Sequence, residues 1–402
     1  MAKVAVLGYG TVGSGVVEVL DTNAAEVSKS AGEALEVKYI LDLRDFPGDK
    51  HEKQVVHDID VILNDPEVEV ICETMGGIEP ALTFEKRALE AGKSVCTSNK
   101  ELVAAHGPEL VELAEKNNVS YLFEASVGGG IPLLRSLNDS LKHEKVDSIT
   151  GILNGTTNYI LTKMDKEGAA FEAVLKKAQE KGYAERNPEA DVEGYDACRK
   201  IAILASLMSG KHVHYEDIYT EGITKINIHD FEYARALNMS IKLLAMCKKN
   251  ENGFFTIVAP FLVPYENPLA SVNGVFNAIS IHGNMLGDVM FYGKGAGKNA
   301  TASAVIADVI DIVKHKGKHI EVNMKAEKAV LTPKDNAVRN FFVRVSEDLE
   351  DQAREVFGND VEVVKRTSIH GEFAFVTEPI SEKDFEEKLW KMDSVKGYIR
   401  LY

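Results

Sequence analysis

The sequence predicts an α/β protein built from a doubly wound parallel sheet, an α+β middle domain and a small C-terminal β-α-β-β-α-β module. Three observations support this prediction. An apolar run and a glycine-rich loop open the chain, apolar runs then alternate with helical patterns up to about residue 130, and six further elements follow a polar linker. A chain of 402 residues is long enough for two or three such domains.

The first predicted strand and the loop after it indicate a dinucleotide-binding site. Residues 3–7 are mostly apolar, as in a strand that is buried on both faces of a parallel sheet. Gly8, Gly10 and Gly13 follow in the spacing Gly-x-Gly-x-x-Gly, directly before a helical pattern. Gly8 permits a tight turn, Gly10 lets the backbone approach a pyrophosphate, and Gly13 lets the helix pack on the strand. This context favours a Rossmann domain over residues 1–130, although a chance glycine-rich turn has the same spacing.

The end of the second predicted strand, 37–41, bears on the choice between NAD and NADP. An acidic side chain there binds the ribose hydroxyls of NAD, whereas an arginine accommodates the 2′-phosphate of NADP. The sequence offers both, as Asp42 and Arg44. We favour a role for Arg44 and therefore NADP as the cofactor. The alternatives are NAD as the cofactor and Arg44 as a solvated surface charge.

The remaining elements continue the alternation and then change character. In the first domain we expect strands at 68–72, 94–97 and 121–125 and helices at 80–91 and 108–117. In a middle domain over 131–320 we expect strands at 145–153, 254–261, 276–281 and 289–292 and helices at 158–166, 170–181, 196–209 and 301–313. After a polar linker at 323–336, the segment 335–402 predicts strands at 341–345, 361–367, 373–376 and 395–401 and helices at 349–357 and 382–392, the order of a ferredoxin-like module.

Composition and charge exclude several classes of protein. The chain is 45% hydrophobic and 27% charged, which is typical of a globular protein. Its net charge of -16 disfavours nucleic acid and anionic membranes as partners. The four cysteines form no Cys-x-x-Cys pair, so we expect reduced, buried thiols rather than disulfides or a zinc site. The start of the chain lacks an apolar signal segment and no apolar run is long enough to span a membrane, so we expect a cytoplasmic protein.

The segment 182–200 carries the strongest chemical signal. Five carboxylates fall in a loop that is rich in glycine and proline, and a helix then starts with Asp196 in its first turn. Asp196 and Lys200 are four residues apart, so they share one helix face. A lysine held beside a carboxylate in a closed site can protonate a developing alkoxide. On spacing alone, an ordinary surface ion pair between these two residues is the better interpretation.

This segment resembles the signature of the homoserine dehydrogenase family. The match includes Ala178, Gly182, Tyr183, Pro188, Asp191, Gly194, Asp196 and Lys200 in one continuous spacing. Other landmarks of the family follow in order along residues 1 to about 315: Gly8–Gly13, Thr97–Lys100, Glu124–Pro132, Asn154–Asn158 and Gly293–Gly297. A pattern of this length is highly specific.

The resemblance implies a reaction and roles for five residues. The reaction is the reversible NAD(P)H-dependent reduction of L-aspartate 4-semialdehyde to L-homoserine, in threonine, methionine and isoleucine biosynthesis. The resemblance assigns the proton donor to Lys200, a second active-site lysine to Lys100, and the orientation of substrate or of a water molecule to Asp196. It assigns substrate binding to Glu185, which would hold the ammonium group, and to Asp191. From the residues alone, Lys100 is equally a surface lysine at the start of a helix.

The resemblance also places the cofactor and a cation. It implies that Glu124, with the backbone carbonyls of Val127, Gly129 and Ile131, holds a structural monovalent cation, sodium or potassium, because hard cations require oxygen ligands. The residues expected to bind NADP, or NAD, are Gly8, Tyr9, Gly10, Thr11, Val12, Gly13, Arg44, Thr74, Ser98, Lys100, Gly182 and Gly297. From the residues alone, Gly293–Gly297 is equally a flexible surface turn.

The C-terminal segment resembles an ACT domain, a module that often binds amino-acid effectors. The turn after its first strand, 345–352, lacks the glycine that ACT domains usually place there. A packing or assembly role is therefore at least as well supported as feedback by threonine. The resemblance further implies a homodimer that pairs through the sheet of the middle domain.

Two other functions remain to be weighed. A dehydrogenase that works through a thiohemiacetal needs an activated cysteine beside a histidine, and Cys198 is the cysteine that lies closest to the catalytic segment. A non-catalytic nucleotide sensor built on a Rossmann domain is the second alternative. A sensor has no need to keep the whole set of Lys100, Glu185, Asp196 and Lys200.

Overall fold

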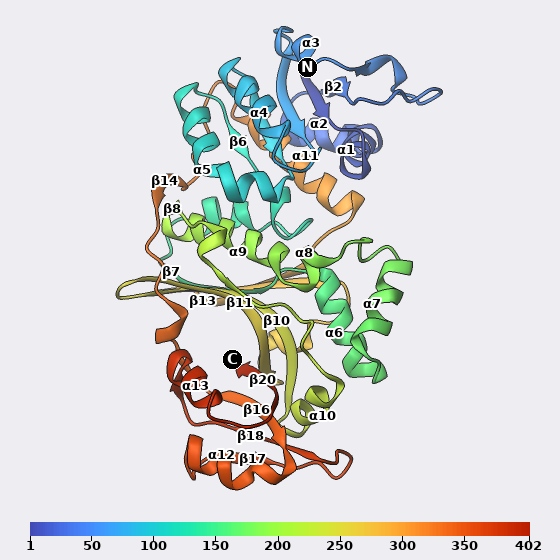
Figure 1. Ribbon diagram of the computed structural model, residues 1–402. Coiled ribbons are helices and arrows are strands. Elements are labelled where there is room, and N and C mark those ends of the chain that lie inside the picture. Colours follow the sequence, from blue (N-terminus) through green and yellow to red (C-terminus); the bar gives the residue numbers. More distant parts are fainter.

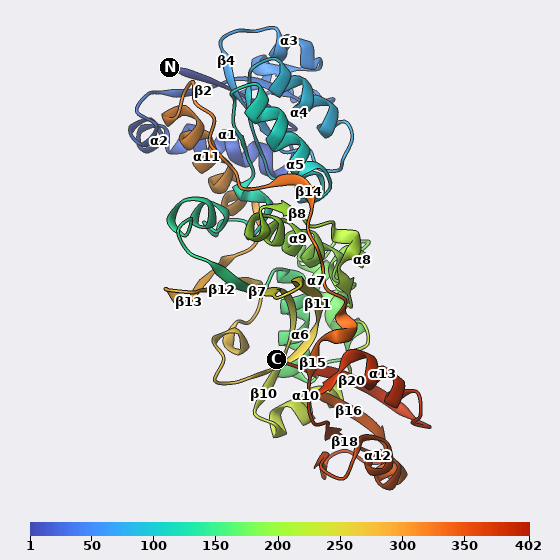
Figure 2. The ribbon, with the colours of Figure 1, turned by 90° about the vertical axis from the view of Figure 1, so that its left-hand side faces the viewer.

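A computed structural model describes residues 1–402, and its three parts follow one another along the long axis of the molecule (Figure 1). The N-terminal domain lies at one end and the C-terminal module at the other, and the view turned by 90° has the same order (Figure 2). Most strands belong to a six-stranded and a ten-stranded sheet. The predicted α/β class is confirmed. None of the helices combines the length and the apolar character that a membrane span requires.

The N-terminal domain is a parallel, Rossmann-like sheet in the strand order β3-β2-β1-β4-β5-β6. The first strand is buried along nearly its whole length, as a central strand covered on both faces must be. The strands are β1 (Ala2–Leu7), β2 (Leu35–Leu41), β3 (Val55–Val56), β4 (Val68–Glu73), β5 (Ser94–Thr97) and β6 (Tyr121–Leu122), and the helices are α1 (Thr11–Thr22), α2 (Ala24–Ala31), α3 (Ile59–Leu63), α4 (Ala81–Glu90) and α5 (Lys100–Lys116).

Helix α5 begins at Lys100, and the predicted start at Pro108 is wrong. The side chain of Asn99 caps the helix by accepting the N–H of Leu102 at 3.1 Å. Pro108 lies inside the helix, where its missing N–H leaves the carbonyl of Ala104 without its usual partner. His212 fills this place, with its Nε2 atom 3.1 Å from the Ala104 oxygen. A side chain from a distant segment thus allows the helix to continue through the proline.

Helix α11 (Lys298–Lys314) packs on α1, although the predicted range 131–320 placed it in the middle domain (Figure 1). The approach is close, because a Cβ atom on Gly15 would lie only 3.0 Å from the Cβ of Ala302. The chain therefore returns to the N-terminal domain after it has built the middle sheet. The prediction followed sequence order, which carries no information on this return.

The middle domain contributes five neighbouring antiparallel strands, in the order β13-β12-β7-β10-β11, to the ten-stranded sheet. Two of its longer elements, α10 and β10, were not predicted, nor were the short α8, β8 and β9. The strands are β7 (Val146–Ile152), β10 (Met239–Asn250), β11 (Gly253–Pro264), β12 (Phe276–Gly283) and β13 (Gly287–Lys294), with the short β8 (Lys211–His212) and β9 (Tyr219–Thr220). The helices are α6 (Gly155–Glu167), α7 (Phe171–Glu180), α8 (Glu189–Val192), α9 (Tyr195–Ser209) and α10 (Ile228–Ala236).

The C-terminal module has the element order β-α-β-β-α-β, and its sheet continues the middle sheet. Its strands lie in the order β20-β16-β18-β17, and β20 pairs in parallel with β11. The linker before it carries β14 (Lys325–Lys328), which pairs with β8. The module consists of β16 (Phe341–Ser346), α12 (Glu350–Phe357), β17 (Glu362–Val364), β18 (Glu372–Val376), α13 (Glu382–Leu389) and β20 (Val395–Leu401), and the short β15 (Val338–Arg339) and β19 (Ile380–Ser381) pair beside it.

Both faces of this small sheet are covered. Along β16, Phe341, Val343 and Val345 belong to the module's own core, which also includes residues of α12 and α13. Phe342 belongs instead to the large core that the module shares with the rest of the molecule. Successive side chains of a strand point to opposite faces, so one face packs on the module's helices and the other on the middle domain.

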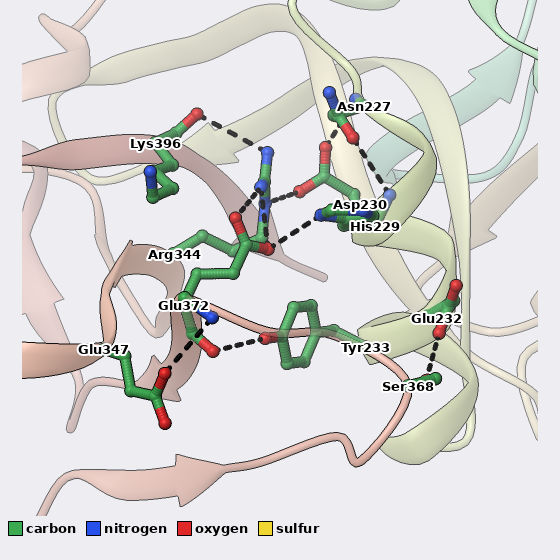
Figure 3. A network of polar contacts seen from close by, with 11 residues as sticks. Asn227, His229, Asp230, Glu232, Tyr233, Arg344, Glu347, Ser368, Glu372 and Lys396 are labelled. Carbon is green, nitrogen blue, oxygen red and sulfur yellow. Dashed lines mark hydrogen bonds and ion pairs between the residues drawn. The ribbon is translucent and has the colours of Figure 1, made fainter.

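An ion network fastens the second face to helix α10 (Figure 3). Arg344, which is 3% exposed, binds Asp230 at 2.5 Å and Glu372 at 3.1 Å. His229 of α10 also contacts Glu372, with its Nδ1 atom 3.1 Å from Oε1. One guanidinium therefore compensates two buried carboxylates, one from the middle domain and one from the module.

We expect Arg344→Met to destabilise the protein strongly, because it leaves Asp230 and Glu372 buried without a counter-charge. Breaking one side of a buried pair costs about 3–5 kcal/mol. The free energy of unfolding can be measured in urea by circular dichroism. Arg354→Met is the control, since Arg354 pairs with Glu350 at 3.2 Å on the surface and such pairs contribute about 0–1 kcal/mol. Equal losses in the two variants would contradict this account of the interface.

Candidate functional site

The glycine loop has the geometry that a dinucleotide site requires. Gly8 has a φ of +89°, which favours glycine. A Cβ atom on Gly13 would lie 1.8 Å from the carbonyl oxygen of Gly8, so only glycine allows α1 to start so close to β1. A Cβ atom on Gly10 would meet nothing within 4 Å, which leaves open space before the first turn of α1. The N–H groups of that turn can therefore receive an anionic group.

Thr74 supports this loop from the end of β4. Its hydroxyl lies 2.9 Å from the carbonyl oxygens of both Leu7 and Gly8, and it donates its single hydrogen there. A cavity of about 460 Å³ extends from the loop along the ends of β2 and β4. Its lining residues are Gly8, Gly10, Leu41, Asp42, Leu43, Arg44, His57, Thr74, Met75, Pro80 and Phe84.

Asp42 and Arg44, the two candidates for discriminating between NAD and NADP, bind each other. The guanidinium of Arg44 donates from Nε and Nη2 to the two oxygens of Asp42, both at 2.9 Å. Asp42 also accepts the N–H of Tyr9 at 2.8 Å. The Arg44 guanidinium holds the pKa of Asp42 well below its usual range. Arg44 is otherwise exposed and lies over the ring of Phe46, so it can turn toward a phosphate at the cavity mouth.

A second cluster lies where α5, α6 and α9 approach one another. Asp196, on α9, binds Lys200 through Oδ2 and Lys100 through Oδ1, each at 2.6 Å. The predicted i,i+4 pair is confirmed, but it is buried rather than on the surface: Asp196 is 3% and Lys200 7% exposed. Lys100 comes from the first turn of α5 in the N-terminal domain. The cluster therefore joins the two domains.

Lys200 has two of its three N–H donors in use. Besides Asp196, it donates to the carbonyl oxygen of Leu153 at 2.8 Å. Burial lowers the pKa of Lys200, whereas the negative charge of Asp196 acts to raise it. Burial would raise the pKa of Asp196, but the two lysines hold that pKa well below its usual range. The charge of Asp196 also raises the pKa of Lys100. The site thus contains a fixed carboxylate and a buried lysine that has one N–H donor without a partner.

Asn154 completes the cluster, and the sequence analysis gave it no role. Its amide nitrogen donates to Asp191 at 2.7 Å and to Asp196 at 2.8 Å. In the sequence it stands out only as part of the motif Asn154–Asn158. A polar residue between an apolar strand and a helix was the available signal, since such residues cap helices.

Glu73 was also missed, and it joins the two loops that lead into the site. It is fully buried at the end of β4 and accepts the N–H of Met75 at 2.6 Å and the hydroxyl of Thr97 at 2.6 Å. Burial raises its pKa. The Thr97 hydroxyl in turn accepts the N–H of Asn99, the residue that caps α5. Glu73 therefore positions the segment that carries Ser98 and Lys100.

Of the other two predicted substrate residues, Asp191 contacts the cluster through Asn154, whereas Glu185 makes no contact with it. Asp191 is partly buried, and burial raises its pKa. Glu185 is exposed, and its side chain makes no hydrogen bond or ion pair. Gly182 has a φ of +71° and Gly297 a φ of +119°, and a Cβ atom on either would meet nothing within 4 Å. These two glycines have open space around them, and the geometry gives them no further role.

The predicted cation ligands lie together in one buried loop. The carboxylate of Glu124 accepts the N–H groups of Leu133, Leu134 and Arg135 at 2.6, 3.0 and 2.6 Å. Burial raises the pKa of Glu124. The carbonyl of Ile131 accepts the N–H of Leu133, whereas those of Val127 and Gly129 accept none. The loop therefore offers two free backbone oxygens for a cation, while the Glu124 carboxylate is already well supplied with donors.

The cysteines have no catalytic setting. All four are free and buried, as predicted. The thiol of Cys198 lies 3.2 Å from the carbonyl oxygen of Tyr215, and burial raises its pKa. A thiohemiacetal mechanism needs an accessible thiolate beside a base, and none of these cysteines provides one.

Comparison with known families agrees with this geometry. The family model described as "Homoserine dehydrogenase, NAD binding domain" matches residues 8–124, and that described as "Homoserine dehydrogenase" matches residues 132–310. Together the two matches cover the glycine loop, α5 and the cluster around Asp196.

Individual proteins give the same result. A homoserine dehydrogenase of Synechocystis is 45% identical over 318 residues, which is 77% of this chain and 73% of that protein. A crystal structure of a homoserine dehydrogenase from Thiobacillus denitrificans superposes with a TM-score of 0.91 at 32% identity, covering 100% of this chain and 98% of that one. A hyperthermophilic archaeal homoserine dehydrogenase in complex with NADPH has a TM-score of 0.66 at 29% identity and covers 77% of this chain and 97% of its own. The chain belongs to the homoserine dehydrogenase family of NAD(P)-dependent oxidoreductases, which act on a CH–OH group.

Proposed function

We propose that this chain reduces L-aspartate 4-semialdehyde to L-homoserine and that Lys200 donates the proton. The observation that carries the proposal is the buried Lys200, held by Asp196 and the Leu153 carbonyl with one N–H to spare. An alkoxide that forms in a site closed to water must take its proton from a neighbouring acid. Lys200 is such an acid, and the reverse reaction uses its neutral amine as the base.

The cofactor residues fit a bound dinucleotide. NAD(P)H supplies the hydride when it is bound. The open space at Gly10 and the N–H groups at the start of α1 suit the pyrophosphate, and the cavity along Arg44 suits the adenosine end. Thr74 and Ser98 lie on the loops after β4 and β5, and Lys100 begins α5, which contacts the Asp196 cluster. Tyr9, Thr11, Val12, Gly182 and Gly297 complete the proposed binding set.

The carboxylates divide the remaining work. Asp191 has one oxygen bound by Asn154 and the other free, so it can pair with the ammonium group of the substrate. Glu185 joins Asp191 in this role, since its exposed side chain is free to fold over the substrate. Asp196 keeps Lys200 and Lys100 charged and oriented. Lys100, with its raised pKa, stays protonated and stabilises negative charge on the reacting oxygen.

We propose NADP as the preferred form of the cofactor, with NAD as an alternative. Arg44 is exposed at the mouth of the cavity, where a guanidinium can bind a 2′-phosphate bidentately. The archaeal relative in complex with NADPH supports this choice. NAD would instead use Asp42, once Arg44 has turned away from it.

We further propose a structural sodium or potassium ion bound by the carbonyls of Val127, Gly129 and Ile131 with Glu124. The two free carbonyls in a buried loop support the site, because a buried acceptor without a partner is unfavourable. The buried Asp308 lies next to Glu124. Burial and the charge of Glu124 raise the pKa of Asp308 to about 8.

We also propose a homodimer and a reducing compartment for this protein. The hairpin of β12 and β13 exposes Met285, Met290 and Tyr292, which suits a homodimer through the middle sheet. A monomer mass by light scattering at micromolar concentration would contradict this. Four free cysteines fit a reducing compartment such as the cytoplasm. For the C-terminal module we propose a packing or assembly role, with effector binding as the alternative.

Lys200→Ala should reduce kcat for aspartate semialdehyde about 10²–10⁴-fold with either nicotinamide, because the proton donor is lost. Turnover can be followed by the absorbance of NADPH. Cys198→Ser is the matched comparison on the same helix and should stay active. Loss of all activity in Cys198→Ser would favour the thiol mechanism, and tight NADPH binding without turnover in the wild type would favour the nucleotide sensor.

Arg44→Ala should raise KM for NADPH about 10–100-fold and leave KM for NADH nearly unchanged, since one charge-assisted contact to the 2′-phosphate is removed. Initial rates at saturating aldehyde give both constants. Lys29→Ala, a change of an exposed lysine on α2, should behave as the wild type. A parallel change in both KM values would contradict a role in discrimination.

Replacing sodium and potassium by choline at equal ionic strength should lower the melting temperature, because a cation present at 100 times its Kd contributes about 2.7 kcal/mol. Differential scanning fluorimetry measures the shift, and added NaCl or KCl should reverse it. Identical melting curves in choline, sodium and potassium would remove the proposed site.

A further inference from the structure

Asn154 lies at the junction of β7 and α6, directly after Leu153. Its Oδ1 atom accepts the N–H of Thr157 at 2.8 Å and the Thr157 hydroxyl at 3.0 Å, so it caps α6. It is 5% exposed. Gly155 follows, where a Cβ atom would lie 2.8 Å from the carbonyl oxygen of Val275. The start of α6 is therefore fixed against the sheet, and the Asn154 amide is fixed with it.

The other end of the amide contacts two carboxylates. Its Nδ2 atom donates one hydrogen to Asp191 at 2.7 Å and the other to Asp196 at 2.8 Å. An amide is a neutral group with two donors. A hydroxyl has only one donor, and an ammonium would add a charge. The chain thus places between its two carboxylates a residue that can bridge them without neutralising either.

The two carboxylates differ in every other contact. Asp196 is bound by Lys100 and Lys200, each at 2.6 Å, in addition to Asn154. Asp191 makes no ion pair, and Asn154 is the single side-chain partner of its carboxylate. Without the bridge, the like charges would repel and Asp191 would compete with Asp196 for the lysines. With the Asn154 bridge in place, Lys100 and Lys200 remain paired with Asp196.

We propose that Asn154 is a positioning residue, which holds Asp191 beside Asp196 as a separate, unpaired charge for the ammonium group of the substrate. The inference rests on the proposed function and deepens it. Leu153 and Asn154 act together, because the Leu153 carbonyl orients Lys200 while the Asn154 amide orients the carboxylates. Two consecutive residues at the end of β7 thus position the proton donor and the ammonium site.

A helix cap alone would explain half of these contacts, so the test separates the cap from the bridge. Asn154→Ser keeps an oxygen that caps α6 but is too short to reach both carboxylates. Asn154→Asp also keeps the cap and replaces both donors by a negative charge. Asn154→Ala removes both functions. Asn227→Ser is the control, because Asn227 caps α10 far from the cluster.

We expect Asn154→Ser to raise KM for aspartate semialdehyde about 10-fold or more, with a smaller change in kcat and a melting temperature close to that of the wild type. Asn154→Asp should shift the pH profile. In the reductive direction activity needs protonated Lys200 and falls as pH rises through the pKa of Lys200. An added negative charge favours the ammonium form, so this fall should move to higher pH, by about a unit or more.

The inference is overturned if Asn154→Ser and Asn154→Asp keep the wild-type KM and pH profile. It is also overturned if Asn154→Ala is the only variant with reduced activity and its melting temperature falls as well. Failure of the proposed function has a different result, namely no turnover in the wild type. In that case crystal structures of Asn154→Ser and the wild type decide the positioning role. Asp191 should leave its place beside Asp196 in the variant, and an unmoved Asp191 would overturn the inference.

Discussion

Asp196 carries its charge at 3% exposure, and the active site depends on how that burial is compensated. A buried carboxylate is tolerated only when it is paired and hydrogen-bonded. Two lysines and one amide meet this condition, and they come from α5, α9 and the end of β7. The same contacts orient Lys200 and bring Lys100 from the nucleotide-binding domain to the middle domain. The charge of Asp196 is unfavourable to bury, and the contacts that compensate it also bring α5, α9 and the end of β7 together.

This arrangement links the proposed cofactor site to the Asp196 cluster. Glu73 ties the loop after β4 to the loop before α5, and Asn99 then fixes the first turn that carries Lys100. A cofactor that occupies the space above these loops would contact the same backbone that sets the position of Lys100. Lys100 is thus held by the same hydrogen-bonded frame as the proposed cofactor site, and its contact with Asp196 extends that frame to Lys200, the proposed proton donor.

The sequence predicted features that depend on local spacing. The glycine loop follows from steric demands within six residues, and the pair of Asp196 and Lys200 follows from one helical turn. Spacing along the sequence could not predict that Lys100 of α5 pairs with Asp196 or that α11 packs on α1, because those contacts join residues far apart in the chain. The helix start predicted at Pro108 was wrong for the same reason, since His212, distant in sequence, binds the carbonyl oxygen of Ala104 that the proline leaves free. The strand β10 was missed because its apolar run, interrupted by lysines, has neither a strand nor a helix period.

A third buried charge network connects the C-terminal module to the middle domain. Arg400, on β20, binds Glu382 of the module at 2.8 Å and Glu221 of the middle domain at 2.6 Å. The residue after Glu221 is Gly222, where a Cβ atom would lie 2.2 Å from the carbonyl oxygen of Val192, in the segment between Asp191 and Asp196. With β20 paired to β11 and Arg344 anchored on α10, the module is joined by buried contacts to the domain that carries Asp191 and Asp196. A module attached by a buried sheet pair and two buried guanidinium networks is a structural extension of the catalytic domain rather than a tethered appendage.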